Sequence, residues 1–241
     1  MQTARAITTI IEMVVTGAFS LLFLYQFFYT FYVLFVKEKE IPFVSQKQHK
    51  FGVIVSARNV ERISEDKPLR MKKEWVPIEE ISPNIVNAVI ASEDNKFMEH
   101  WGFDFDAIKL AAEKNKKRNS TAFGASTISQ QTAKNLFLWP DRSWFRKGLE
   151  VYFTLLIELF WSKERIMEVY LNIIEMGDGI YGIERAANIY YDISASELNR
   201  EQAAIIAASL PSPRKYNPKN PTAYLKKRQS QILKVMRQMG K

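Results

Sequence analysis

An uncharged, strongly apolar run near the N-terminus constrains this chain more than any other feature. Residues 13–36 of the 241 contain no Asp, Glu, Lys or Arg and are rich in Leu, Phe, Val and Tyr. As a helix the run would extend about 36 Å, enough to cross a bilayer core of about 30 Å. The alternative is a cleaved signal peptide, but the run is long and shows no small-residue cleavage site. We therefore expect one retained transmembrane helix, whose orientation the flanking charges do not fix.

The remaining sequence divides around this run. We expect a short tail at residues 1–12, a polar linker at 37–50 and a folded domain at 51–241, in which 51–56 forms a strand and 74–81 is extended or looped. Apolar periodicity and capping residues predict a mostly α domain with little strand. Helices are expected at about 83–98, 105–117, 128–137, 144–161, 163–176, 183–191 and 201–210, with a last one beginning near 221.

Composition narrows the classes of partner and site. The net charge of +8 suggests an anionic partner, either nucleic acid, a membrane surface or a phosphate-bearing substrate. The chain has no cysteine and two histidines, which excludes disulfides and thiolate metal sites and argues against a histidine-rich metal site. A hard cation held by carboxylates remains compatible with the sequence.

Acidic, aromatic and imidazole groups converge in the stretch SEDNKFMEHWGFD, residues 92–104. If the helix from Pro83 runs to about residue 98, then Glu93, Phe97 and His100 lie on one face, and Gly102 offers a stop. One interpretation is a catalytic carboxylate beside a histidine. The other is a solvated helix charge followed by a C-terminal histidine cap.

Two further clusters carry polar and charged side chains. The first begins the helix at 128–137, where Ser126 or Thr127 can act as the cap and a group of amides surrounds a lysine: Gln130, Gln131, Lys134 and Asn135. Helix N-termini bind anions, so this is either an anion site or ordinary surface. The second cluster places Arg146 and Lys147 within one turn of Glu150 on an otherwise apolar helix, which is either a site or a simple helical ion pair.

Taken in order, these segments resemble the five motifs of the peptidoglycan glycosyltransferase domain found in class A penicillin-binding proteins and in monofunctional membrane-anchored transglycosylases. The first motif is matched by Glu93, Asp94, Phe97, His100 and Gly102. The second is matched by Gly124, Ser126, Thr127, Ile128, Gln130, Gln131, Lys134 and Asn135. The last three are matched by Arg146, Lys147 and Glu150, by Tyr170, Leu171, Asn172 and Gly177, and by Leu210, Pro211, Pro213, Tyr216 and Pro218. Because the chain ends soon after the fifth motif, we expect the monofunctional form without a transpeptidase domain.

The resemblance implies a lysozyme-like, mostly helical fold with a small membrane-proximal lobe, and polymerisation of lipid II onto a nascent glycan strand. An acceptor sugar hydroxyl would displace undecaprenyl pyrophosphate with inversion, forming a β-1,4 bond. A poor hydroxyl nucleophile needs a base, for which we choose Glu93. The pyrophosphate needs charge neutralisation, which Lys134 and Arg146 would supply, with hydrogen bonds from Gln131 and Thr127.

Other roles follow from the resemblance less directly. Glu150 matches the second essential carboxylate and would either orient Arg146 and Lys147 or position the donor. Asp94, Phe97 and His100 would shape the wall of the site, and Arg118 would reach substrate phosphates. No cofactor is firmly implied; a Mg or Mn ion at the pyrophosphate is conceivable, but the sequence assigns it no ligands.

The resemblance also implies a location and partners. We expect a single-pass protein of the bacterial cytoplasmic membrane, with its catalytic domain on the outer face and other cell-wall synthesis proteins as possible partners. Tethering confines enzyme and lipid-linked substrates to one thin layer. Two rival functions are a lysozyme-like enzyme that cleaves glycan and a non-catalytic scaffold of cell-wall assembly. Nucleic-acid binding is disfavoured because the basic residues lack interleaved exposed aromatics.

Overall fold

The computed structural model describes residues 75–118, 124–140 and 143–239, which belong to one compact unit within residues 49–241. The expected transmembrane helix at 13–36, the linker at 37–50 and the expected strand at 51–56 all lie outside the described residues. Among the helices that are described, none combines the length and the apolar character needed to cross a membrane.

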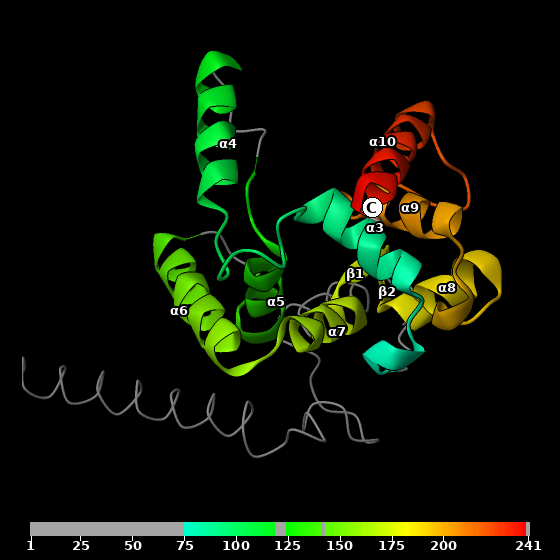
Figure 1. Ribbon diagram of the computed structural model, residues 1–241, viewed down its shortest axis with the longest axis horizontal. Coiled ribbons are helices and arrows are strands. Elements are labelled where there is room, and N and C mark those ends of the chain that lie inside the picture. Colours follow the sequence, from blue (N-terminus) through cyan, green and yellow to red (C-terminus); the bar gives the residue numbers. More distant parts are fainter. Residues whose placement is uncertain (1–74, 119–123, 141–142, 240–241) are drawn as a thin grey trace, which may run out of the picture. The chain divides into compact units, whose positions relative to one another are not determined.

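The described part of the chain is mostly helical, as predicted (Figure 1). Its helices are α3 (Pro83–Glu93), α4 (Phe105–Arg118), α5 (Ile128–Phe137), α6 (Trp144–Phe160), α7 (Lys163–Ile173), α8 (Ile183–Tyr191), α9 (Arg200–Ser209) and α10 (Ala223–Met239), with short 3₁₀ turns η2 (Ile78–Glu80) and η3 (Ala195–Glu197). Two short strands, β1 (Glu175–Gly177) and β2 (Ile180–Tyr181), pair antiparallel, with Glu175 opposite Tyr181 and Gly177 opposite Ile180.

Helix starts follow the capping residues in the sequence. The hydroxyl of Ser82 accepts the Asn84 N–H, and Pro83 occupies the first turn of α3. Thr127 forms a reciprocal capping box with Gln130 at the start of α5. Asn199 does the same with Gln202 at the start of α9. These caps satisfy amide groups that the helix cannot pair internally, which is why the predicted starts were confirmed.

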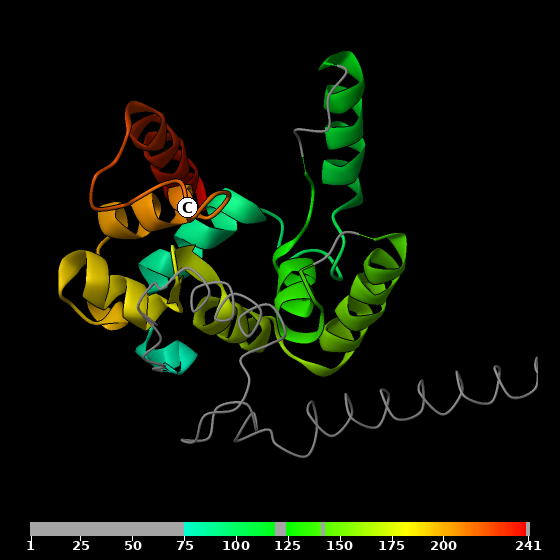
Figure 2. The ribbon, with the colours of Figure 1, turned by 180° about the vertical axis from the view of Figure 1, so that it is seen from behind.

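Two groups of helices build the core. The alanine-rich helix α9 is buried from Ala203 to Ser209, and its small side chains let α3 and α10 pack closely against it. In the second group α5 packs against both α6 and α7 (Figures 1 and 2). Helix α4 projects away from both groups in the two views. The site lies where α3 ends and α5 begins.

Two predicted boundaries were wrong. Helix α3 ends at Glu93 and not near residue 98. Asp94 leaves the helical conformation, and its carboxylate accepts the backbone N–H of Ile128 at the start of α5. Helix α7 ends at Ile173, since Gly177 must lie in a strand against Tyr190; an added Cβ there would meet the tyrosine oxygen at 2.0 Å. The segment predicted to be extended or looped at 74–81 contains the short 3₁₀ turn η2 in its described part, which is compatible with that prediction.

Candidate active site

Glu93, the last residue of α3, has both carboxylate oxygens in polar contact. Oε1 accepts a hydrogen bond from Ser92 Oγ at 3.1 Å and lies 3.7 Å from the guanidinium of Arg228. Oε2 accepts from the side-chain amide of Gln131 at 3.1 Å. The Gln131 oxygen in turn accepts from the Tyr170 hydroxyl at 3.3 Å. The carboxylate is therefore held from three helices, α5, α10 and its own.

Glu93 lines a cleft with a volume of about 530 Å³. The cleft lies between the end of α3, the loop before α5 and the first turns of α4 and α10. It is lined by Ala91, Ser92, Glu93, Asp94, Asn95, Asp104, Ala107, Gly124, Ala125, Ser126, Thr127, Gln131, Pro211 and Arg228. The Glu93 side chain is 12% exposed, so its carboxylate is reachable from the cleft while most of it is shielded.

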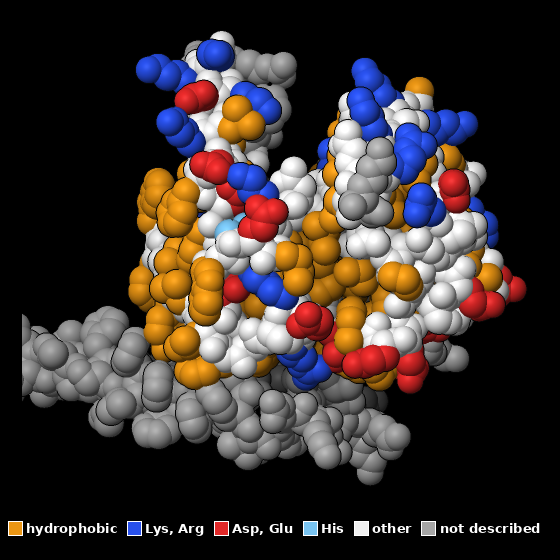
Figure 3. Space-filling model, viewed as in Figure 1, with side chains coloured by type: hydrophobic (Ala, Val, Ile, Leu, Met, Phe, Trp, Pro, Cys, Tyr) orange, Lys and Arg blue, Asp and Glu red, His pale blue; other side chains and the backbone are white. Residues whose placement is uncertain are grey.

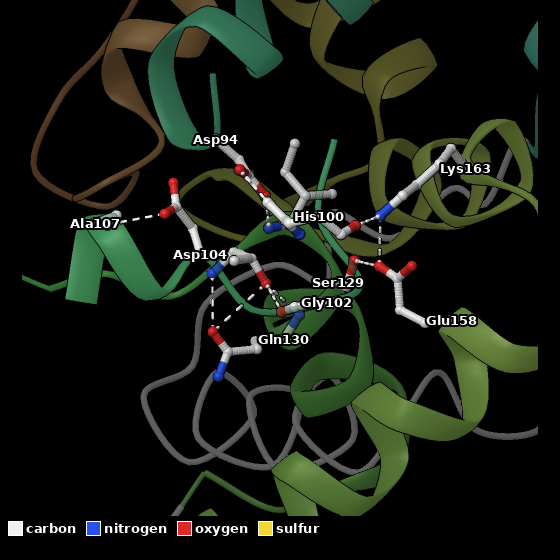
Figure 4. A network of polar contacts seen from close by, with 11 residues as sticks. Asp94, His100, Gly102, Asp104, Ala107, Ser129, Gln130, Glu158 and Lys163 are labelled. Carbon is white, nitrogen blue, oxygen red and sulfur yellow. Dashed lines mark hydrogen bonds and ion pairs between the residues drawn. The ribbon is translucent and has the colours of Figure 1, made fainter. Parts of the chain in front are cut away.

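Asp94 joins α3 to α5 (Figure 4). One oxygen lies 2.8 Å from His100 Nε2, and the other accepts the backbone N–H of Ile128, the first residue of α5, at 3.0 Å. Burial raises the pKa of the Asp94 carboxyl, while the hydrogen bonds from His100 and Ile128 oppose that rise. Its two partners give Asp94 a framework role at the wall of the cleft.

Phe97 and His100 lie behind this wall and are not part of the cleft lining. The interpretation that Glu93, Phe97 and His100 share a helical face was wrong, because α3 stops at Glu93. Instead Phe97 is fully buried and meets the His100 ring edge to face, with centroids 6.4 Å apart. The ammonium of Lys163 lies over the Phe97 ring and also contacts the His100 carbonyl and Glu158.

Two residues of the second motif, Thr127 and Gln130, hold the start of α5. The Thr127 hydroxyl donates to the Gly102 carbonyl at 2.6 Å and accepts from the Gln130 N–H. The Gln130 side-chain oxygen accepts the Thr127 N–H, so this buried amide serves the cap. Ser126, in contrast, is exposed and faces the cleft.

The third motif forms a charge cluster on α6, to which α5 adds Lys134. Glu150 is 3% exposed and pairs with Arg146 at 3.1 Å and with Lys147. Lys134 on α5 lies near this cluster. Burial lowers the pKa of Lys134 most, the nearby charge of Glu150 opposes that change, and Arg146 and Lys147 lower the pKa further. The predicted ion pairs were thus confirmed, and a lysine from a second helix joins them.

The structure connects these two clusters through α5. Gln131, which contacts Glu93, and Lys134, which lies in the cationic cluster, are one turn apart on that helix. Asn135 is half-buried on the same helix. Arg118 ends α4, and its side chain lies outside the described part of the structure.

Sequence reasoning missed two residues that surround Glu93. Ser92 was treated only as the start of the stretch, although its hydroxyl contacts the carboxylate. Arg228 lies 136 residues from the serine to which it donates, and no local pattern distinguishes it from the other basic residues of α10.

Within the described ranges, no group of three or more His, Cys, Asp or Glu residues is placed to hold a metal ion.

The fold and the site together define a helical domain equipped for acid–base chemistry on a substrate that carries negative charge. A carboxylate lines a cleft, and three cations gather around a second, buried carboxylate nearby. The chain belongs to the transglycosylase family, whose model matches residues 59–237. The resemblance noted from the motifs is therefore confirmed.

Several curated relatives agree with this assignment. A biosynthetic peptidoglycan transglycosylase of Bacteroides thetaiotaomicron is 59% identical over 180 residues, which cover 74% of this chain and 72% of that protein. Proteins of the same name from Bdellovibrio bacteriovorus and Ectopseudomonas mendocina are 53% and 51% identical. Those matches cover 73% and 76% of this chain, and 70% and 75% of the respective relatives.

Proposed function

We propose that this chain is a peptidoglycan glycosyltransferase that polymerises lipid II into β-1,4-linked glycan strands. The 4-hydroxyl of one sugar attacks the anomeric carbon of the donor, undecaprenyl pyrophosphate leaves, and the configuration inverts. One observation carries the proposal: Glu93 lines the cleft with both oxygens oriented, while α5 leads from it to a cluster of three cations.

Glu93 is the general base of this proposal. As the new C–O bond forms, the attacking hydroxyl loses its proton to the carboxylate, which avoids a high-energy oxonium species. The contacts from Ser92 and Gln131 fix the carboxylate plane before the substrate arrives, which lowers the cost of orientation. An ionised base beside the acceptor hydroxyl is what the reaction requires.

The cationic cluster stabilises the leaving group. The bond to the anomeric carbon breaks with its electron pair on the pyrophosphate oxygen, so positive charge near that oxygen lowers the barrier. Lys134, Arg146 and Lys147 supply this charge. Both oxygens of Glu150 are paired with Arg146 and Lys147, which supports a role in orienting these cations rather than in contacting the donor.

The contacts of Glu150 also favour synthesis over glycan cleavage. A retaining or inverting glycosidase uses a second carboxylate as nucleophile or water base, and that group must be free to reach the sugar or its water. Here the second carboxylate is buried and doubly ion-paired. Such a group is better suited to holding cations for a phosphate leaving group.

An exposed apolar stripe along α6 supports contact of this domain with the membrane surface (Figure 3). Trp144, Val151, Leu155 and Leu159 recur at helical spacing along α6 and are 93%, 37%, 52% and 64% exposed. Exposed apolar surface of this extent in a soluble setting is costly, and a lipid interface would cover it. Trp144 is suited to the interfacial region in particular.

The proposal includes the finer architecture and the location. We assign a lysozyme-like domain whose small lobe, containing α4 and the apolar side of α6, lies next to the bilayer. A single transmembrane helix at 13–36 precedes it, in the bacterial cytoplasmic membrane, with the catalytic domain on the outer face. Lipid II would then enter from the layer in which its polyprenyl chain is dissolved.

Polymerisation of labelled lipid II by the full-length chain in detergent tests this function. The wild-type chain should yield a ladder of glycan products on a gel, and Glu93→Gln should lower the rate by about 10²–10⁴-fold, because an amide cannot accept the proton. Glu99→Gln, an exposed glutamate of the same segment, is the matched control and should behave as wild type. A ladder of normal rate from Glu93→Gln would refute the mechanism, and shortening of finished glycan strands would favour the lytic alternative.

A further inference from the structure

Arg228 reaches the candidate base from α10, a helix outside the five sequence motifs. One guanidinium nitrogen donates to Ser92 Oγ at 3.1 Å and lies 3.7 Å from Glu93 Oε1. The side chain also lines the cleft. Helix α10 therefore brings a positive charge to the carboxylate oxygen that Gln131 does not contact.

The Ser92 hydroxyl links Arg228 to Glu93. It accepts from the guanidinium, and its single proton can be donated either to Glu93 Oε1 at 3.1 Å or to the Ala207 carbonyl at 3.2 Å. The positive charge of the arginine polarises this hydroxyl and strengthens its donation toward the carboxylate. Arg228 thus acts on Glu93 both through Ser92 and directly by its charge.

The other carboxylate oxygen is fixed by a neutral chain of donors. Burial raises the pKa of the Tyr170 phenol well above its usual range, and the charges of Glu93 and Asp94 raise it further, so Tyr170 remains a hydroxyl donor. It donates to the Gln131 oxygen, which turns the Gln131 amide nitrogen toward Glu93. Arg228 is therefore the cation among the three residues that fix Glu93, beside neutral Ser92 and Gln131.

The Arg228 Nε is buried and has no hydrogen-bond partner among the described residues. A buried donor without a partner costs free energy on folding. Arg146 and Arg185 also have an unpaired Nε, so the case for Arg228 depends on its contacts with Ser92 and Glu93 at the wall of the cleft.

We propose that Arg228 is a positioning residue for Glu93: with Ser92 it holds the carboxylate in the one orientation from which it accepts the proton of the acceptor hydroxyl. This inference rests on the proposed function, since it assigns Arg228 a part in the same reaction. It predicts an effect on the chemical step and little effect on substrate binding.

Steady-state kinetics of the full-length chain with labelled lipid II test the proposal. Arg228→Met keeps the length of the side chain and removes its charge and donors; kcat should fall about tenfold or more while KM changes little, because the lost interaction assists the transition state. Arg228→Lys keeps a positive charge and should recover part of kcat. Lys227→Met removes an exposed charge from the neighbouring position of the same helix and should leave both constants unchanged.

A double-mutant cycle with Ser92→Ala tests the path of the effect. If Arg228 acts partly through the serine, the double variant should lose less activity than the product of the two single losses. Losses that multiply would contradict the coupling. Melting temperatures accompany each variant, and should Arg228→Met fail to fold, Arg228→Lys and Ser92→Ala carry the test through their intermediate kcat at unchanged KM.

The outcomes separate this inference from the function on which it rests. A wild-type kcat in the Arg228 variants would overturn the positioning role and leave the glycosyltransferase intact. A raised KM with unchanged kcat would overturn it in favour of direct substrate binding. If the wild-type chain makes no polymer, the proposed function fails and this inference fails with it.

Discussion

At the scale of single residues, Gly102 shows how tightly the site is fitted to its support. Its φ of +77° lies in the left-handed region, and an added Cβ would meet the Thr154 methyl carbon at 2.7 Å. Its carbonyl accepts the hydrogen bond of Thr127 that helps to fix the start of α5. The sequence suggested a helix stop here, but the residue serves a close approach to α6.

We expect Gly102→Ala to lower the free energy of unfolding by about 1–3 kcal/mol, because the new methyl group adds both backbone strain and a clash. Urea denaturation monitored by circular dichroism measures the loss. Gly148→Ala is the matched control: Gly148 is exposed within α6, and nothing lies within 4 Å of an added Cβ. That change should stabilise the chain by about 0.5–1 kcal/mol. Equal effects of the two changes would contradict this account of Gly102.

At the scale of elements, the sequence predicted the helix starts, which depend on residues close together in the chain. It missed features that depend on contacts between distant parts of the chain. Cap residues such as Thr127 and Asn199 identify helix starts because the hydrogen bonds span three residues. The end of α3 could not be predicted, since Asp94 is drawn to Ile128 of another helix. Arg228 was missed for the same reason, while Arg146 and Glu150 were found because they pair within one turn.

Because α5 packs against α6, the Lys134 ammonium is largely buried, and this burial lowers the stability of the folded chain. Burial is the main cause that lowers its pKa, so the folded state disfavours the charged form. Between the folded pKa and the unfolded value of 10.5, the unfolded chain binds more protons, and this residue's contribution to stability rises with pH. A charge that assists a leaving group is thus maintained at the expense of stability.

We expect Lys134→Met to abolish polymerisation yet to raise the free energy of unfolding at pH 7. The gain over wild type should shrink as the pH rises through the folded pKa toward 10.5, because the lysine loses its proton first in the folded state and then, around and above 10.5, in the unfolded state as well. Denaturation midpoints between pH 7 and pH 10.5, taken as differences from wild type, measure this trend. Lys117→Met, an exposed change on α4, should show no such trend. A variant less stable than wild type at pH 7 would contradict the assigned cost of burial.

At the scale of the whole molecule, the net charge of +8 predicted an anionic partner, and the run at 13–36 predicted a membrane helix that lies outside the described residues. Neither feature could predict the exposed stripe of α6. The sequence of that helix is apolar on most sides and does not tell which apolar residues are buried. In the structure one face packs against α5, and the exposed face carries Trp144, Leu155 and Leu159 where a soluble protein would carry charge. The stripe follows from the combination of helical phase and packing against α5, which only the folded chain reveals.

If this stripe is seated in lipid, Trp144 should be quenched by bromine on acyl chains. The full-length chain in vesicles containing brominated phospholipid provides the measurement, and the difference between wild type and Trp144→Phe isolates this one tryptophan from the other four. We expect strong quenching by bromine near the headgroup end of the acyl chains and weak quenching by aqueous iodide, because the ring would lie in the interfacial region, in contact with the upper acyl chains and shielded from bulk water. Tyr224→Trp introduces a probe at a half-exposed position of α10, away from α6 in both views, and its added fluorescence should respond to iodide instead. Quenching of Trp144 by iodide alone would show that α6 faces water, and would leave 13–36 as the only part of the proposed membrane attachment.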